Sequence, residues 1–114
     1  MVRALVLYSN GKYKAKELKN LKEFQKEVGG YLELLPAYGD CNVTCYVNEE
    51  GALRNMPLSP WTPFMRTLHV SIGPVTLLRG NILLFGKEPD DEGDETSIEP
   101  DIIESARLFH NEYL

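Results

Sequence analysis

Hydrophobic and polar residues alternate along much of the chain in a way that predicts a sheet. Residues 2–8 are a short apolar run, and residues 13–18 return after Asn10-Gly11, the dipeptide that most favours a hairpin turn. Lys12, Lys14 and Lys16 give the second strand a charged face. Because lysine discourages further strand pairing, this strand is predicted to lie at a sheet edge.

The next segment has the spacing of a short amphipathic helix. Asn20 is suited to cap it, and Leu21, Phe24 and Val28 fall on one face of residues 21–28. Gly29 and Gly30 follow, and two glycines after a helix predict a left-handed C-terminal cap, where glycine alone avoids a Cβ clash. We therefore expect a valine at Gly30 to resist a positive φ.

Four further segments complete the predicted architecture. Residues 31–38 read as a strand that becomes irregular at Pro36, and residues 41–48 as a strand with its alternate apolar residues on one face. Residues 68–72 and 77–85 read as a fifth strand and as a bent strand or strand pair around Gly80-Asn81. A second helix starts near Ile98, with Pro100 in its first turn. The pattern predicts one α+β domain over residues 1–114, mainly an antiparallel sheet of five to six strands with two helices.

Composition and charge predict the compartment of the protein and exclude some classes of partner. No apolar run approaches the roughly 18 residues of a membrane helix, and two cysteines without an export signal indicate a reducing compartment. We therefore predict a cytoplasmic protein without a membrane association. A net charge of −5 argues against direct nucleic-acid binding. Basic residues concentrate in residues 1–26, whereas residues 88–104 carry acidic side chains and no basic one.

Candidate catalytic and metal-binding residues are sparse. Cys41 and Cys45 lie about 13 Å apart on a strand at roughly 3.3 Å per residue, too far to bridge or share an ion. Neither His69 nor His110 is spaced to activate a nucleophile. The acidic run 88–95 lacks the ligand order of a calcium loop, and a solvated loop, a protein contact and a metal site remain open for it. These patterns predict no enzyme, no cofactor and no metal.

The proline-rich segment 53–66 is where a functional interpretation competes with a structural one. Pro57, Pro60 and Pro63 exclude a long helix or a central strand. The segment is too apolar to hang in water, so it packs either on the core or on a partner. As a binding surface, it would use the residue types enriched at interface anchors: Met56, Trp61, Phe64 and Met65.

Three stretches resemble a known family. They are Val28-Gly29-Gly30-Tyr31-Leu32-Glu33, the run from Asn48 to Leu53, and the run from Asn81 to Gly86, followed by an acidic loop and a C-terminal helix. Together they resemble small uncharacterised proteins of phages, large algal viruses and bacterial mobile elements. The chain departs from that pattern in residues 55–66 and 73–80. The resemblance implies a small accessory protein of an infected cell and carries no catalytic residue.

Two functional hypotheses follow. In the first, the protein binds a host or viral protein, or a second copy of itself as a homodimer, through the proline-rich segment, with the acidic segment 88–95 as a second candidate contact. In the second, it sequesters a small molecule, such as a nucleotide signal, in a pocket or at a subunit interface. The side chains that would stack on a base or contact a phosphate are Tyr31, Tyr38, Tyr46, Trp61 and Arg79.

Overall fold

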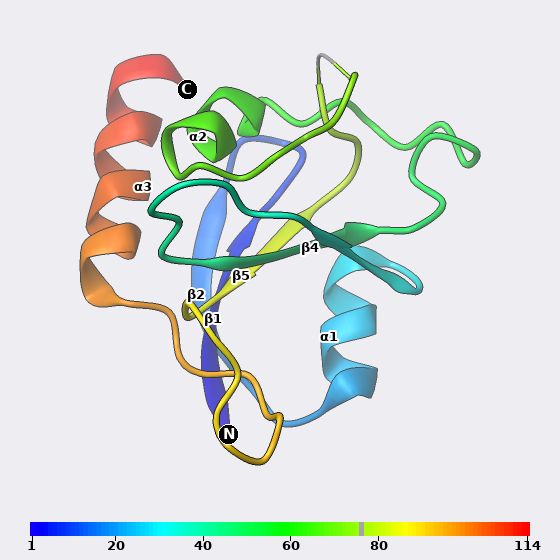
Figure 1. The fold of residues 1–114 in the computed structure, drawn as a ribbon. Coiled ribbons are helices and arrows are strands. Elements are labelled where there is room, and N and C mark those ends of the chain that lie inside the picture. The colour runs from blue at the N-terminus through cyan, green and yellow to red at the C-terminus, as the bar shows by residue number, and fades with distance from the viewer. Residues whose placement is uncertain (76) are drawn as a thin grey trace.

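The computed structural model, which describes residues 1–75 and 77–114, contains one five-stranded sheet with the order β2-β1-β5-β4-β3 (Figure 1). All four pairings between neighbouring strands are antiparallel. The strands are β1 (Val2–Leu7), β2 (Tyr13–Leu18), β3 (Leu32–Leu35), β4 (Thr44–Asn48) and β5 (Ile82–Phe85). The α+β prediction is confirmed, and so is the edge position of β2.

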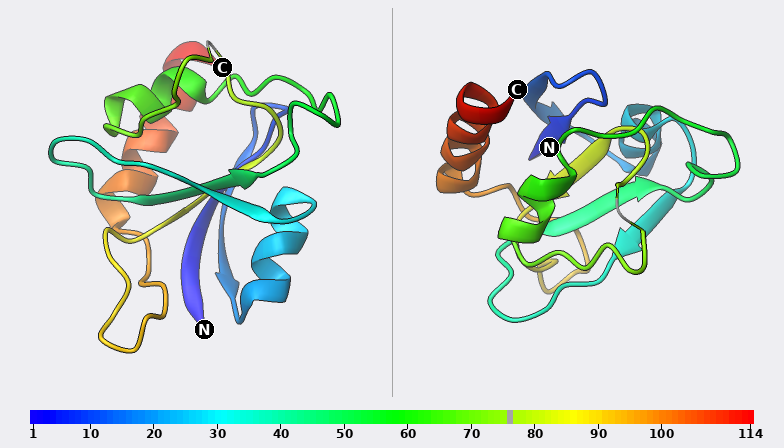
Figure 2. Two further views of the ribbon diagram at one scale, coloured as in Figure 1. Left: turned by 45° about the vertical axis from the view of Figure 1, so that its right-hand side comes forward. Right: turned by 90° about the horizontal axis from the view of Figure 1, so that it is seen from above.

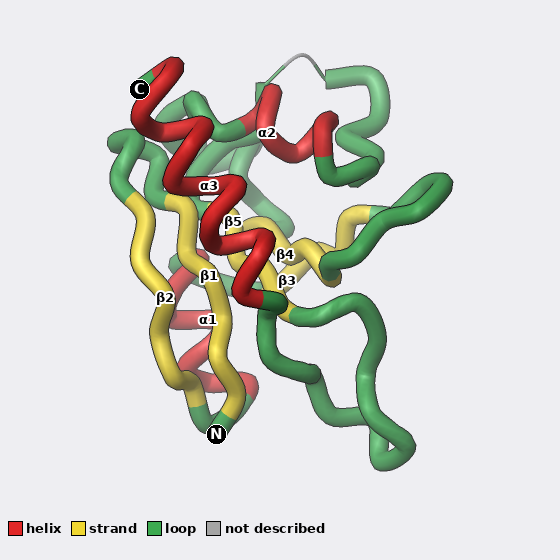
Figure 3. The backbone as a smooth tube through the Cα atoms, turned by 90° about the vertical axis from the view of Figure 1, so that its left-hand side faces the viewer, coloured by secondary structure: helices red, strands yellow, loops and turns green. Residues whose placement is uncertain are grey.

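Helices cover both faces of the sheet. Figure 3 shows α3 (Pro100–Tyr113) in front of β1 and α1 (Leu21–Val28) behind it. The central strand β1 alternates accordingly: Leu5 and Leu7 enter the core under α3, and Ala4 and Val6 enter the core under α1. All four side chains are fully buried, as expected for a strand with apolar residues on both faces.

The local signals around α1 act largely as predicted. Asn20 has extended φ and ψ angles, and its side-chain oxygen accepts a hydrogen bond from the Glu23 amide at 3.0 Å. Gly29 adopts the left-handed conformation with a φ of 82° and donates its amide to Gln25. Gly30 does not have a positive φ, so the expectation that valine would be strained there by a positive φ is wrong. A Cβ at Gly30 would instead lie 2.9 Å from Asn48 Nδ2.

The hairpin between β1 and β2 is also confirmed. Gly11 has a φ of 92°, and the Tyr8 amide donates to the Lys12 carbonyl at 2.9 Å. The Asn10 side chain accepts the Lys12 amide at 2.9 Å. The turn is therefore a three-residue loop with glycine at its left-handed position.

Two predicted strands are corrected. Residues 68–72 do not form a strand, because His69 takes a φ of 63° and turns the chain, which leaves only an isolated bridge between Ala37 and Val70. The bent strand predicted over residues 77–85 shortens to β5, since Gly80 has a φ of 81° just before it. Thr76, in the segment 73–80, lies outside the described residues.

The proline-rich segment ends in a short helix that the sequence did not predict. Pro63 occupies the first turn of α2 (Thr62–Thr67), where a missing amide costs no hydrogen bond. α2 packs on the same side of the sheet as α3 (Figure 2). Prolines at residues 57 and 60 precede α2 and therefore do not interrupt it.

The aromatic residues of this segment lie in the core. Trp61 has no exposed surface, and Phe64 and Met65 are also buried. The Trp61 ring packs against Tyr13 and Phe109, and its Nε1 donates to the Lys12 carbonyl at 3.2 Å. Of the two interpretations of this segment, the structure supports packing on the core: these side chains join the hairpin to α3 and expose almost no surface to a partner.

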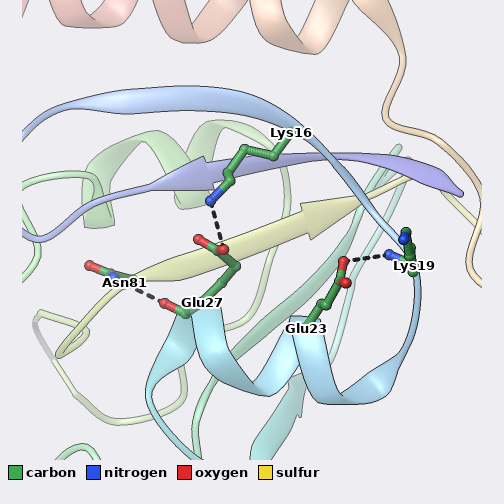
Figure 4. Close-up of polar contacts among 5 residues, drawn as sticks. All are labelled: Lys16, Lys19, Glu23, Glu27 and Asn81. Atoms are coloured by element: carbon green, nitrogen blue, oxygen red, sulfur yellow. Dashed lines mark hydrogen bonds and ion pairs between the residues drawn. The ribbon is translucent and has the colours of Figure 1, made fainter.

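A polar network attaches α1 to the sheet (Figure 4). Lys16 on β2 donates to the Glu27 carboxylate at 2.8 Å, and the Asn81 side chain donates to the Glu27 carbonyl at 3.0 Å. The Lys19 amide donates to Glu23 at 2.9 Å. The Glu27 carboxylate, through its own hydrogen bond and charge, raises the pKa of Lys16. The network thus links strand β2, helix α1 and the start of β5.

Candidate functional site

Strand β3 forms the second edge of the sheet, and part of that edge has no strand partner among the described residues. The Glu49 amide donates to the Tyr31 carbonyl at 2.9 Å, so the odd-numbered residues of β3 direct their backbone groups toward β4. The even-numbered residues, Leu32 and Leu34, therefore direct theirs to the outside. Farther along the same side, the Pro36 carbonyl accepts the Ser71 amide at 2.7 Å. The backbone hydrogen bonds that residues 69–71 make to the outer side of the chain thus end at Pro36, two residues after Leu34.

A groove lies where these hydrogen bonds end. Its volume is about 400 Å³, and we call it the β3 groove. The sheet provides one wall and the chain after α2 provides the other. It is lined by residues 33–36, 47–49, 51–52, 71–75 and 77–79.

The position of β3 depends on the two glycines before it. The Asn48 side chain donates to the Val28 carbonyl at 3.0 Å, and Arg54 donates to the Gly29 carbonyl at 2.7 Å. Both side chains pass close to Gly30, where a Cβ would meet Arg54 Nη1 at 3.2 Å. The close approach requires a residue without a side chain, and it fixes where the edge strand begins.

The opposite wall is attached at both ends. At its start Ser71 bonds to Pro36, and at its end the Leu78 amide donates to Thr62 Oγ1 at 2.9 Å. The Arg79 guanidinium donates to the Asn55 side chain and to the Met56 carbonyl, both at 3.0 Å. These contacts attach Ser71 at one end of the wall, and Leu78 and Arg79 at the other, to the rest of the chain.

The groove combines apolar surface with negative charge. Leu34, Val75 and Leu77 are 57%, 47% and 39% exposed, which is high for large aliphatic side chains. Glu33 and Glu49 are exposed carboxylates that make no ion pair among the described residues. The cation in the lining is Arg79, whose guanidinium is already bonded within the chain. An apolar surface with local negative charge suits a ligand that is apolar and partly basic.

Tyr46, another predicted binding residue, lies at a different place. Its hydroxyl donates to Glu95 Oε2 at 2.5 Å, beside a second cavity of about 560 Å³ lined also by Phe24 and Leu32. Burial, together with the hydrogen bond to Glu95, raises the pKa of Tyr46. The pair holds part of the acidic loop 88–95 against the α1 side of the sheet.

The remaining predicted binding residues do not converge. Arg79 lies in the β3 groove, Trp61 lies in the core, and Tyr46 lies on the other side of the sheet. Tyr31 is exposed near the start of β3, and Tyr38 packs its ring against His69 with 5.3 Å between ring centroids. Met56 is partly buried, and its sulfur would lie 3.2 Å from a Cβ at Gly80.

Each shifted pKa lies farther from pH 7 than the ordinary value of that group. Burial raises the pKa of the Cys45 thiol, and hydrogen bonding between Arg107 and Glu104 raises the pKa of the first and lowers that of the second. Cys41 and Cys45 are free thiols, buried on one face with Val43 and Val47 as the alternation predicted. Within residues 1–75 and 77–114, no group of three or more His, Cys, Asp and Glu side chains could hold a metal ion.

Comparison with known proteins places the chain in a family. It belongs to the family described as a domain of unknown function, DUF3846, whose sequence model matches residues 2–111. No curated protein and no solved structure gives a significant match. None of the helices in the described part of the chain is long and apolar enough to span a membrane.

Sequence reasoning did not find the β3 groove. One signal was available: residues 32–35 carry a single charged side chain, Glu33, whereas β2 carries three charges over six residues. A lysine-free edge strand is a candidate for pairing with another chain. The groove itself had no local signal, because its two walls come from segments about 40 residues apart.

Proposed function

We propose that this protein is a protein-binding module, which accepts an extended segment of a partner as an added strand along β3. The observation that carries the proposal is the interrupted outer ladder of β3. Residues 36 and 38 bond to residues 69–71, whereas the outward backbone groups of Leu32 and Leu34 have no backbone partner among the described residues, and Leu34 borders the groove. An added strand satisfies such groups with main-chain hydrogen bonds, and pockets for its alternate side chains supply specificity.

The described residues of the two groove walls also support this function. Leu35 and Val47 on the sheet side and Val75 and Leu77 on the opposite side offer apolar contacts to an incoming strand. The attachment of both ends of the outer wall lowers the ordering cost on binding, which favours affinity. The nucleotide hypothesis receives less support, since its proposed contact residues are distributed over the core, the groove and the opposite face.

The biological setting we propose is that of an accessory protein of a phage, a large virus or a mobile element, which acts without catalysis on a protein of the infected cell. This part of the proposal rests on the resemblance of the three short motifs described above. The binding mode does not depend on it, because it rests on the geometry of β3.

A proline substitution tests the binding mode. Leu34→Pro removes an amide that points outward, so it deletes a donor for the added strand without breaking the ladder to β4. Ala15→Pro on β2 is the matched control. The Tyr8 amide donates to the Lys12 carbonyl, so the even-numbered residues of β2 direct their backbone groups toward β1. The backbone amide of Ala15 therefore points away from the sheet, as the amide of Leu34 does.

The experiment captures partners from infected cells with each variant, identifies them by mass spectrometry and then measures binding of the purified partner. We expect the wild-type chain and Ala15→Pro to bind it, and Leu34→Pro to lose at least tenfold in affinity. Binding should also slow hydrogen exchange at the Leu32 and Leu34 amides. A partner that binds Leu34→Pro as well as wild type, or leaves those two amides unprotected, would contradict strand addition.

A further inference from the structure

The register of β3 determines whether a second copy of the chain fits its edge. An antiparallel pair of two β3 strands uses all the outward groups of Leu32 and Leu34 only when Leu32 of each copy lies opposite Leu34 of the other. That register places Glu33 directly opposite the Glu33 of the second copy. Like charges directly opposite each other destabilise a strand pair.

The two neighbouring antiparallel registers conflict with the chain itself. Centring the pair on Leu32 would bring Leu34 opposite Gly30, whose amide already donates to the Gln25 carbonyl at 3.0 Å. Centring the pair on Leu34 would bring Leu32 opposite Pro36 of the second copy. Pro36 has no amide to donate, and its carbonyl already accepts the Ser71 amide at 2.7 Å. The segment 69–71 also occupies the outer side of residues 36–38, where the second copy would have to lie. The edge is therefore open to a strand but poorly matched to itself.

We infer that the β3 edge selects an extended segment of a different protein, with apolar side chains flanking a lysine or arginine that lies opposite Glu33. The inference rests on the proposed function and names the chemistry of its partner. Because Glu33 directs its backbone toward β4, its partner on the added strand stands at a non-hydrogen-bonded position, where facing side chains approach most closely. Glu49, in the same groove, adds a second negative charge.

Two capped heptapeptides serve as probes: Thr-Val-Val-Lys-Val-Val-Thr and the same peptide with Glu in place of Lys. Binding to the whole chain is measured by fluorescence anisotropy at low salt. We expect the Lys peptide to bind about five- to tenfold more tightly, because a favourable cross-strand charge pair replaces a repulsive one. Glu33→Lys should reverse this preference.

Glu17→Lys on β2 is the matched control, since it makes the same charge change at an exposed position of the other edge. It should leave the preference for the Lys peptide intact. Equal binding of both peptides to the wild-type chain would overturn the charge selection while leaving strand addition in place. Failure of both peptides to bind would also overturn this inference, and the Leu34→Pro experiment decides separately on the proposed function.

Sedimentation equilibrium tests the argument against self-pairing. The wild-type chain is expected to remain monomeric at concentrations where Glu33→Thr forms dimers, because threonine removes the facing charges. Glu17→Thr should stay monomeric. A wild-type dimer whose Leu32 and Leu34 amides are protected from exchange would overturn the inference, since the edge would then accept a second copy.

Discussion

Strands β2 and β3 are the two edges of one sheet, and they differ in the side chains that accompany the exposed edge of the backbone. β2 carries Lys14, Lys16 and Glu17, and its Lys16 bonds to Glu27 on helix α1 (Figure 4). β3 carries one charge among four residues and borders a groove. Charge along an edge discourages pairing, whereas an apolar edge next to a formed wall favours it. The difference supports the proposal that a partner strand is added at β3 and not at β2.

The two edges also differ in how deeply they connect to the core. The hairpin that leads into β2 is held by Trp61, which bonds to the Lys12 carbonyl and packs on Tyr13. Near β3, the aromatic Tyr31 is 67% exposed. Truncation of Trp61, beside β2, should therefore act on folding, whereas truncation of Tyr31, beside β3, should leave folding almost unchanged.

The largest expected effect is that of Trp61→Ala. Removing a fully buried ring should lower the free energy of unfolding by about 3–5 kcal/mol, because a cavity forms and the Lys12 carbonyl loses one of its two donors. Tyr31→Ala is the control and should change it by less than about 0.5 kcal/mol. Urea denaturation of both variants measures the difference. A stable Trp61→Ala protein would show that this residue is not part of the core.

The turn that leads into β3 should show an intermediate effect with two separable causes. Valine at either Gly29 or Gly30 is expected to cost about 1–3 kcal/mol, at Gly29 because φ is positive and at Gly30 because Asn48 and Arg54 are too close. Asparagine tolerates the left-handed conformation, so Gly29→Asn should cost less than Gly30→Asn. Thermal melts of the four variants test this order, and equal losses for the two asparagine variants would contradict it.

The smallest expected effect concerns the ion pair beside β2. Lys16→Met should lower the free energy of unfolding by about 0.5–1 kcal/mol, and Lys14→Met by less, because Lys14 forms no ion pair among the described residues. The pKa of Lys16 is raised in the fold, so this contribution is complete below the unfolded-state value of 10.5. It is lost as the pH rises through the higher folded-state pKa.

Denaturant melts of wild type and Lys16→Met at neutral pH and above pH 10.5 check the sign. The gap between the two proteins should narrow as the pH rises. A gap that widens with pH would mean that Lys16 is destabilising when charged, which is incompatible with its hydrogen bond to Glu27.

The sequence by itself determined the elements whose causes are local. Asn10-Gly11 marked the hairpin, Asn20 and Gly29 marked the two ends of α1, and Pro100 marked the first turn of α3. The lysines of β2 marked an edge, and the period-two burial of residues 41–47 marked a sheet face. Each signal acts over a few residues, because capping, turn geometry and alternation depend on near neighbours.

Only the tertiary structure decided which segments pair, which side chains are buried and where a groove forms. Periodicity alone could not show that His69 turns the chain and prevents the strand predicted over residues 68–72. Nor could composition decide between a core and a surface for Trp61, since a buried ring and an interface anchor share the same residue type. The β3 groove exists because segment 69–71 pairs with residues 36–38 and then leaves the edge. A site formed between distant segments depends on packing, which no local pattern encodes.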